Sequence, residues 1–256
     1  MYLVLALVAF AAGVVNSMAG GGTLLTFPSL LAFGVPSITA NATSTVALVP
    51  GSFSAFLGLR DAEGARLRDD LPLLVVSAVG GLVGALLLLY VGDAVFSKLV
   101  PWLILGATGL FLVREPLSRW QERRAASAPR SNEPRAGFHG AVLVGQLFLG
   151  VYGGFFGAGS GILMLAVLGL FGYRDIHQMN RLKNLANVAF NTVASVTFIV
   201  GRHVEWRLVA VMMGGAIVGG YGGSGIAKRI GQANVKRIVI AVGIAMGIYT
   251  LVKTYA

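Results

Sequence analysis

Two glycine-rich stretches carry the residues best suited to chemistry in this chain. The first runs from Gly13 to Thr23 as GVVNSMAGGGT, and the second runs from Gly150 to Ser160 as GVYGGFFGAGS, with matching glycines in the same register. Glycine accepts the dihedral angles of a sharp break and leaves its backbone N–H groups open to approach. A helix that begins after such a break has unpaired N–H groups and a partial positive charge at its start. Two such helix starts that face each other would bind an anion without a buried cation.

The candidate anion-binding residues of these stretches are the glycines of each break with the amide and hydroxyl side chains beside them. They are Asn16, Gly20, Gly21, Gly22 and Thr23 in the first stretch and Gly157, Gly159 and Ser160 in the second. The alternative is that glycine only allows close helix packing, and we prefer that interpretation for Gly80, Gly84, Gly215, Gly219 and Gly223. A nucleotide-binding loop is excluded because Thr23 is followed by leucines, with no lysine among the glycines.

Polar residues also open the segment that follows each break. In the first half they are Asn41, Thr43, Ser44 and Thr45, of which the first three are candidate ligands, and in the second they are Asn184, Asn187 and Asn191. The steps of three and four residues place the three asparagines on one helical face. An amide in hydrocarbon either bonds a neighbouring helix or lines a cavity, and both alternatives stay open. Arg181 and Lys183 lie next to this face. They are cytoplasmic anchors or, alternatively, cations that attract the anion, and Lys183 is included among the candidate substrate-binding residues.

Composition places the chain in the membrane. Of its 256 residues, 56% are hydrophobic and 12% charged, with a mean hydropathy of +0.79, against about 25% charged residues in soluble domains. We therefore expect an all-α polytopic membrane protein. The net charge of +10 comes from short loops without interleaved aromatic residues, so we expect no nucleic-acid partner. There is no cysteine and no histidine pair at metal-ligand spacing, and we expect no metal and no cofactor.

Apolar runs give five segments in each half. They cover about 2–16, 23–33, 41–59, 71–91 and 95–113, then 138–152, 160–172, 184–200, 207–226 and 235–255. Residues 114–136 form the one long polar connection. The sequence thus predicts a first transmembrane repeat at 1–113, a linker at 114–136 and a second repeat at 137–256. The first two segments of each half are shorter than the ~20 residues of a full crossing. They form two short tilted helices or a re-entrant hairpin, and either returns the chain to the side from which it entered.

The basic residues then fall unevenly on the two sides of the membrane. Loops 60–70, 114–136, 173–183 and 227–237 carry 16 lysines and arginines, and the opposite side carries 4. If each short pair instead makes one net crossing as a broken helix, the division is 12 to 8, and the positive-inside rule favours the sharper asymmetry. It then predicts a cytoplasmic linker, both termini outside, and a second half inverted relative to the first. Duplicated halves with glycine-broken helices are typical of secondary transporters that bind their substrate near the membrane midplane.

The sequence resembles the TauE/SafE family of permeases, the sulfite exporter type, along nearly its whole length. The resemblance lies in AGGGTLLTFPSLLAFGVPSITANATS (19–44), GAGSGILMLAVLGLFGYRDIHQMNRLKN (157–184) and GRHVEWRLVAVMMGGAIVGGYGG (201–223). It implies transport of small anions, typically sulfite or organosulfonates, across a bacterial inner membrane. The second copy has Ala158 and Ser160 where the first has Gly21 and Thr23, so the two half-sites differ chemically.

We therefore expect a secondary permease for small sulfur-containing anions that works by alternating access. The alternatives from other classes are an anion channel and an intramembrane enzyme, but Ser160 has no histidine within its predicted membrane depth to act as a base. The expected partners are the anion and the lipid bilayer, with a homodimer as the oligomer to test.

Overall fold

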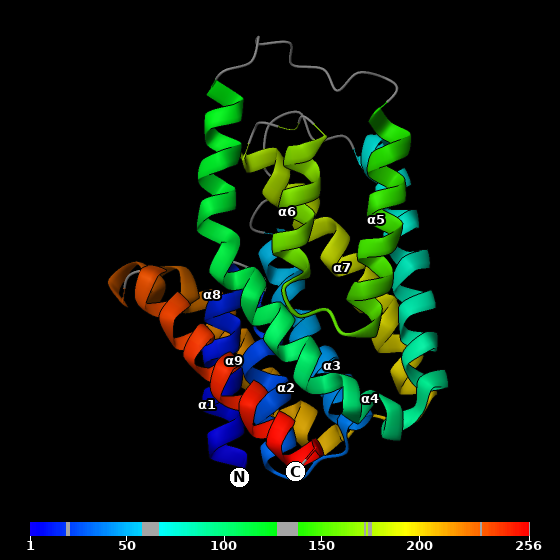
Figure 1. Ribbon diagram of the computed structural model, residues 1–256, viewed down its shortest axis with the longest axis vertical. Coiled ribbons are helices and arrows are strands. Elements are labelled where there is room, and N and C mark those ends of the chain that lie inside the picture. The colour runs from blue at the N-terminus through cyan, green and yellow to red at the C-terminus, as the bar shows by residue number, and fades with distance from the viewer. Residues whose placement is uncertain are drawn as a thin grey trace.

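The computed structural model describes residues 1–18, 21–57, 67–126, 138–171, 173, 176–230 and 232–255, and in this part of the chain the regular secondary structure is all helical. The expected all-α fold is therefore confirmed for this part of the chain. The helices in chain order are α1 (Tyr2–Met18), α2 (Thr23–Ala32), α3 (Ser37–Leu57), α4 (Leu67–Ala126), α5 (Phe138–Phe155), α6 (Ser160–Leu170), α7 (Ile176–Val200), α8 (Trp206–Ile230) and α9 (Gln232–Tyr255) (Figure 1).

Helix α4 consists of two helices that meet at Gly92. The φ and ψ angles of Gly92 are 77° and 162°, which are not helical, and the predicted segments 71–91 and 95–113 lie on either side of it. The second of these helices continues to Ala126, so residues 114–126 of the predicted polar linker are helical. A long polar helix end can extend into water because its backbone groups are already bonded within the helix. Residues 127–137 lie outside the described part of the chain.

Each glycine-rich break joins two helices that double back on each other. Val35 and Pro36, after α2, line the same surface hollow as Met1 and Tyr2 at the start of α1. In the second half, a Cβ atom on Gly145 of α5 would lie 3.9 Å from the ring of Phe171, which follows α6. Both hairpins therefore return to the end of the molecule at which they began (Figure 1). The 10 residues of α2 and the 11 of α6 are about half of what a full crossing needs.

The longest helix contacts join the two halves of the chain. Helix α1 packs against α8, and α4 packs against α5. At both contacts glycines face backbone, because a Cβ atom on Gly84 would overlap the carbonyl oxygen of Val151 and one on Gly219 would overlap that of Phe10. Small residues that let helix backbones approach closely are what hold helices together in lipid. These positions therefore have the packing geometry that their spacing predicts.

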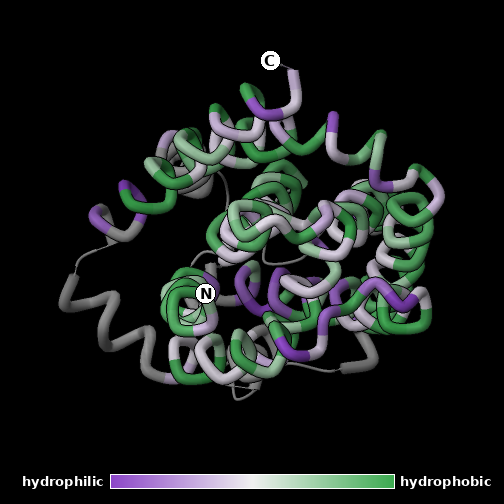
Figure 2. Tube along the Cα trace, turned by 90° about the horizontal axis from the view of Figure 1, so that it is seen from below, coloured by the Kyte–Doolittle hydropathy of each residue, from purple (hydrophilic) through white to green (hydrophobic). Residues whose placement is uncertain are grey.

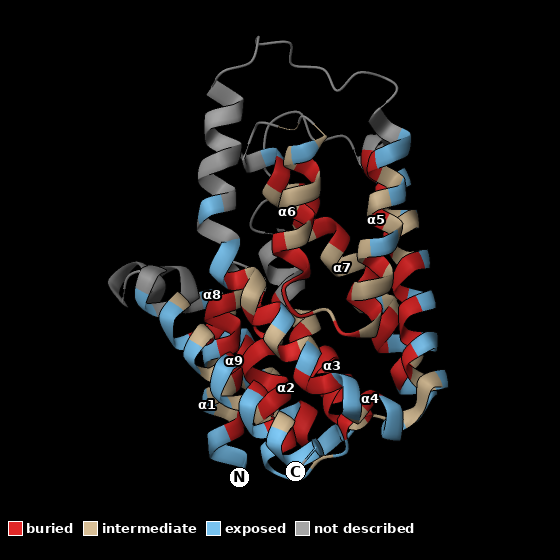
Figure 3. Cartoon of the chain, in the orientation of Figure 1, coloured by how far each residue is buried: buried red, intermediate tan, exposed pale blue. Residues whose placement is uncertain are grey.

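The exterior of the bundle is apolar. Val79, Val83 and Leu86 on one face of α4 are about half exposed, at 48%, 47% and 51%. By length and composition, Asp70–Val113 and Lys236–Tyr255 could cross a membrane. Hydrophobic residues predominate along the helices in Figure 2, and in Figure 3 the buried residues concentrate in the helices enclosed by the others. A surface of this kind suits contact with lipid rather than with water.

Candidate functional site

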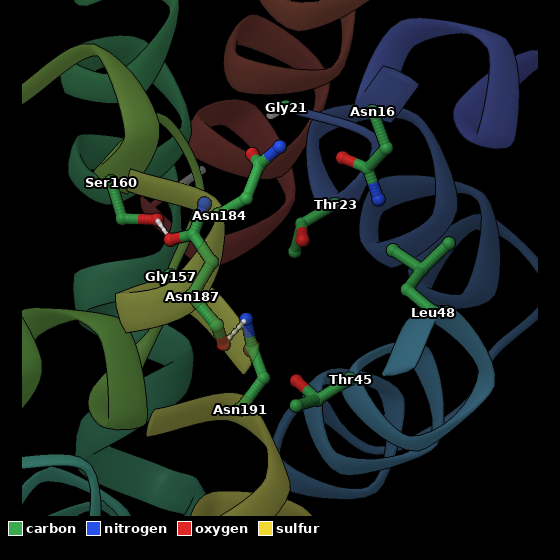
Figure 4. Close-up of a pocket in the computed structure, with 10 residues that line it drawn as sticks. All are labelled: Asn16, Gly21, Thr23, Thr45, Leu48, Gly157, Ser160, Asn184, Asn187 and Asn191. Atoms are coloured by element: carbon green, nitrogen blue, oxygen red, sulfur yellow. Dashed lines mark hydrogen bonds between the residues drawn. The ribbon is translucent and has the colours of Figure 1, made fainter. Parts of the chain in front are cut away.

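A small cavity lies where the two glycine-rich breaks meet, and we call it the central cavity. It has a volume of about 40 Å³, which is room for about three water molecules or a small ion in their place. Its walls come from both breaks and from α3 and α7 (Figure 4). The lining residues are Asn16, Gly21, Thr23, Thr45, Leu48, Gly157, Ser160, Asn184, Asn187 and Asn191.

Helix α2 begins at the cavity wall. The N–H group of Gly22 donates a hydrogen bond of 2.8 Å to Oδ1 of Asn16, so the side chain of Asn16 is held against the break. Gly22 has ordinary helical angles of −58° and −28°. Glycine is required here for space, because a Cβ atom on Gly21 would overlap the ring of Phe111, and one on Gly22 would lie 2.6 Å from the carbonyl oxygen of Ala12. Thr23, the first residue of α2, lines the cavity.

Helix α6 begins at the same cavity after a different kind of break. Gly157 and Gly159 have φ angles of 76° and 78°, which side chains disfavour, so glycine is required here for conformation. The hydroxyl of Tyr152 donates to the carbonyl oxygen of Ala158 at 2.5 Å and fixes the turn. Ser160, the first helical residue, donates to Oδ1 of Asn187 at 3.4 Å. The conformational argument for glycine therefore holds in the second break, whereas steric contact explains the first.

The three asparagines predicted to share a face of α7 all line the cavity. In Figure 4 they lie on the side of Ser160, and Asn16, Thr23 and Leu48 lie on the other side. Nδ2 of Asn191 donates to the carbonyl oxygen of Asn187 at 2.9 Å, which orients one amide by the helix itself. All ten lining residues are electrically neutral. The electrostatic character of the cavity therefore comes from amide and hydroxyl dipoles and from the positive ends of α2 and α6.

The three candidates at the start of α3 are placed elsewhere. Nδ2 of Asn41 donates to the carbonyl oxygen of Phe155 at 3.2 Å, and Oγ1 of Thr43 accepts the N–H of Glu205 at 3.1 Å. The hydroxyl of Ser44 lies 2.6 Å from that of Thr26. All three side chains are buried and bond other helices or loops, so they lie outside the set that lines the central cavity. Of the two alternatives for a polar side chain in hydrocarbon, these three residues of α3 bond neighbouring helices or loops, whereas the three asparagines of α7 line the cavity.

Two lining residues of α3, Thr45 and Leu48, are not among the sequence candidates. The sequence could have indicated Thr45, since it directly follows Ser44 in the same polar run. In the structure its hydroxyl donates to the carbonyl oxygen of Asn41 at 2.8 Å. Leu48 is apolar and gives no signal in sequence. Gly20 lies outside the described residues, and Gly159 lies in the second break without lining the cavity.

The basic residues beside the asparagines lie inside the protein. Arg181 forms a two-pronged ion pair with Asp70 of α4, with Nη2 at 3.1 Å from Oδ1. Lys183 is only 4% exposed, and its Nζ donates to Oδ1 of Asn180 at 2.9 Å. Neither residue is an exposed anchor at the membrane surface. A buried lysine is also poorly placed to attract ions from solution, so the steering role expected for Lys183 does not fit its position.

Tyr173 lies beyond α6, near the same ion pair. Burial raises the pKa of its hydroxyl, and the negative charge of Asp70 raises that pKa further. Tyr173 therefore stays neutral at physiological pH.

The fold and the cavity together define a class of protein: a helical membrane transporter, with two helices that begin at a polar cavity inside an apolar bundle. The chain belongs to the sulfite exporter TauE/SafE family, whose sequence model matches residues 5–250.

Curated relatives agree with this assignment. The chain is 30% identical over 240 residues to a protein of Haemophilus influenzae named "Probable membrane transporter protein", covering 93% of this chain and 90% of that protein. It is also 30% identical over 244 residues to "Probable membrane transporter protein YfcA" of Escherichia coli, covering 95% and 87%. These names indicate a transporter rather than an enzyme. No solved structure matches the chain.

Proposed function

We propose that the protein is a secondary transporter for small anions, most of all sulfur-containing oxyanions such as sulfite or organosulfonates. One observation carries the proposal: the first residues of α2 and α6 line one cavity together with three asparagines, and the lining residues that the structure describes include no carboxylate. Helix starts and amide N–H groups attract negative charge. The sulfur-containing substrate class rests on the description of the family.

The binding residues in this proposal are those of the cavity with the buried cation beside it. Asn187 and Asn184 supply amide donors, and Thr23 and Ser160 supply hydroxyls at the two helix starts. Lys183 adjoins Asn184 in sequence and adds positive charge inside the protein, which would offset the charge of a bound anion. Asn41, Thr43 and Ser44 support α3 in the present conformation.

The mechanism we propose is alternating access between two inverted repeats, residues 1–113 and 137–256. It is supported by a contact that occurs twice. A Cβ atom on Gly13 would meet the carbonyl oxygen of Ala216, and one on Gly150, the equivalent of Gly13 in the repeat, would meet that of Ser77. The two contacts are equivalent to within one helical turn. When Gly80 is aligned with Gly215, the position equivalent to Ser77 lies one turn before Ala216. In transporters such repeats rock against each other around a fixed midplane site.

The orientation follows from the positive charges. We place the connection between α4 and α5 in the cytoplasm and both termini outside, in a bacterial inner membrane. A single cysteine at Ser97 should react with an impermeant thiol reagent from outside, and one at Ser127, beyond the described end of α4, from the cytoplasm only. The natural chain has no cysteine to interfere. Reaction of both from one side would contradict the orientation and the inversion.

The function is tested by ligand screening followed by flux. Purified protein is heated with sulfite, thiosulfate, sulfoacetate, taurine, sulfate or short carboxylates, and an anion that binds only the folded state raises the melting temperature. The best anion is then loaded into proteoliposomes. Saturable uptake accelerated by the same anion on the other side identifies a carrier. Flux that does not saturate and shows no such exchange identifies a channel and would contradict alternating access.

A further inference from the structure

A second and larger pocket lies at the end of the molecule that carries both termini. We call it the outer pocket. Its volume is about 420 Å³, and its walls are the turn after α2, the second helix of α4 and the end of α9. The polar and charged residues that matter for the argument are Ser37, Asp93, Ser97, Lys98, Thr250 and Lys253.

The outer pocket has an excess of positive charge. Asp93, the carboxylate among the described lining residues, accepts hydrogen bonds that hold the local structure. Its Oδ1 accepts the N–H of Ile38 at 2.8 Å, and its Oδ2 accepts the hydroxyl of Ser97 at 3.4 Å. Within the described part of the chain, neither Lys98 nor Lys253 forms an ion pair. Nζ of Lys253 lies 5.9 Å from the centre of the Tyr249 ring, which attracts the cation without neutralising it. Among the described lining residues, two lysines and one carboxylate give one net positive charge.

A cluster of four phenylalanines, three of them buried and one partly buried, lies between the outer pocket and the central cavity. The cluster consists of Phe27 of α2, Phe96 of α4, Phe155 at the end of α5 and Phe156 directly after it. The ring of Phe27 is centred 5.4 Å from that of Phe156 and 6.3 Å from that of Phe96, and Phe96 lies 5.6 Å from Phe155. Phe156 directly precedes Gly157 of the central cavity, and Phe96 directly precedes Ser97 of the outer pocket. Along α2, Phe27 lies one turn after Thr23 of the central cavity and one turn before Leu31 of the outer pocket, so the cluster lies between the two.

Asn41 marks the same boundary. Its side chain is 1% exposed and bonds the carbonyl oxygen of Phe155, but its Oδ1 atom is buried without a hydrogen-bond partner in the described structure. A buried acceptor without a partner is costly. An arrangement in which the phenylalanines move apart and water reaches Asn41 would remove that cost. The polar atom and the rings thus lie where an opening would begin.

We propose that the outer pocket is an anion-binding vestibule, and that the phenylalanine cluster is the closed gate between this vestibule and the central cavity. The ligand is a small oxyanion or sulfonate, recognised by the charges of Lys98 and Lys253. This inference rests on the proposed function and orientation. The same charges could hold a phospholipid headgroup, since lysine binds phosphate as a point charge; the experiment separates these two sources of anion.

The test measures the electrostatic potential in the outer pocket without any transport. Ala94 lines the pocket, and Ala94→Cys is reacted in phosphatidylcholine vesicles with an impermeant anionic reagent, 2-sulfonatoethyl methanethiosulfonate, and with its trimethylammonium analogue. The two reagents differ by two charges, so a potential of one kT changes their rate ratio about sevenfold. We expect the ratio of the anionic to the cationic reaction rate to exceed the ratio measured for a free thiol in solution. This ratio should fall severalfold when Lys98→Gln and Lys253→Gln are added. Arg202→Gln, at the same end but outside the pocket wall, is the matched control.

The vestibule proposal would be overturned if the ratio equals that of a free thiol. It would also be overturned if Arg202→Gln lowers the ratio as much as the two lysine changes do. A fall in the ratio on adding phosphatidylglycerol that is larger than the fall at a surface thiol on the same vesicles would assign the lysines to a lipid headgroup and overturn the proposal equally. Because no transported anion is needed, this result is independent of whether the flux assay succeeds. A failed flux assay with an intact ratio would count against the proposed function alone.

The gate is tested with Thr45→Cys, which places a thiol inside the central cavity. The anionic reagent added from outside should react with this thiol at least tenfold faster when Phe96→Ala is present, and faster to a smaller extent with the milder Phe96→Leu. The reagent ratio of Ala94→Cys in the same backgrounds shows whether the outer pocket is still folded. If the thiol at position 45 reacts at the parent rate in both variants while the ratio at position 94 is unchanged, the cluster is not the gate.

Discussion

Helices α3 and α7 occupy equivalent places in the two halves of the chain but use their polar residues differently. On α3, Asn41, Thr43 and Ser44 each bond a different partner outside the helix. On α7, Asn184, Asn187 and Asn191 line the central cavity. In a membrane both uses satisfy a polar group, but only the second leaves a donor for a ligand. These residues of α3 therefore support the structure, whereas the asparagines of α7 are available for binding.

The two halves share their packing rather than their polar chemistry, and this predicts equal damage from one type of change. Gly84→Val and Gly219→Val should each yield little folded protein, because each added side chain would overlap a backbone carbonyl, of Val151 and Phe10 respectively. Folded yield is measured by size-exclusion chromatography in detergent. Gly106→Val is the matched control, since a Cβ atom there meets nothing within 4 Å. A large loss at one position and none at the other would break the equivalence of the two helix contacts.

A second comparison concerns Ser44 and Arg181, which are equivalent positions when the two glycine-rich breaks are aligned. Arg181→Gln leaves Asp70 buried without its partner, and we expect a loss of about 3–5 kcal/mol of stability. Ser44→Ala removes one neutral hydrogen bond to Thr26 and should cost about 1 kcal/mol. Both are followed as melting temperatures. Addition of Asp70→Asn to Arg181→Gln should restore part of the lost stability. If the double variant loses as much stability as the two single variants together, the broken ion pair is not the cause of the loss in Arg181→Gln.

The support and binding roles are separated most directly by Asn187 and Thr43. Asn187→Leu should weaken anion binding tenfold or more, since a hydrogen bond to a charge is worth about 1.5–3 kcal/mol. Thr43→Val should lower the melting temperature, because the N–H of Glu205 loses its acceptor, while the dissociation constant changes less than twofold. Calorimetric titration with the best anion measures both affinities. Equal losses of affinity would indicate a symmetric site and contradict the division of roles.

The smallest expected effect compares the two helix starts. Thr23→Val and Ser160→Ala each remove a hydroxyl from the cavity wall, and each should lower affinity by about 0.5–1.5 kcal/mol, or roughly two- to tenfold. Ser160→Ala should be the larger, because Ser160 also orients Asn187. The same titration measures the difference. If neither change affects binding, the hydroxyls face the cavity without contacting the anion.

The sequence alone determined those features that depend on local pattern. Hydrophobic runs identify the membrane helices because hydrocarbon excludes charge, and glycine spacing identifies the helix contacts because close approach in lipid requires small residues. The three asparagines share a face through helical periodicity, and the glycines of the two breaks repeat in one constant register. None of these inferences needs to know which helix lies beside which.

Only the tertiary structure decided which polar residues face the cavity. Thr43 meets Glu205 across 162 residues of chain, and Arg181 meets Asp70 across 111. Such pairings depend on how the helices pack in three dimensions, and no local pattern encodes them. The same holds for Leu48 in the cavity wall and for the phenylalanine cluster, whose rings come from three helices. Periodicity fixes the face on which a side chain lies, but packing fixes what that face meets.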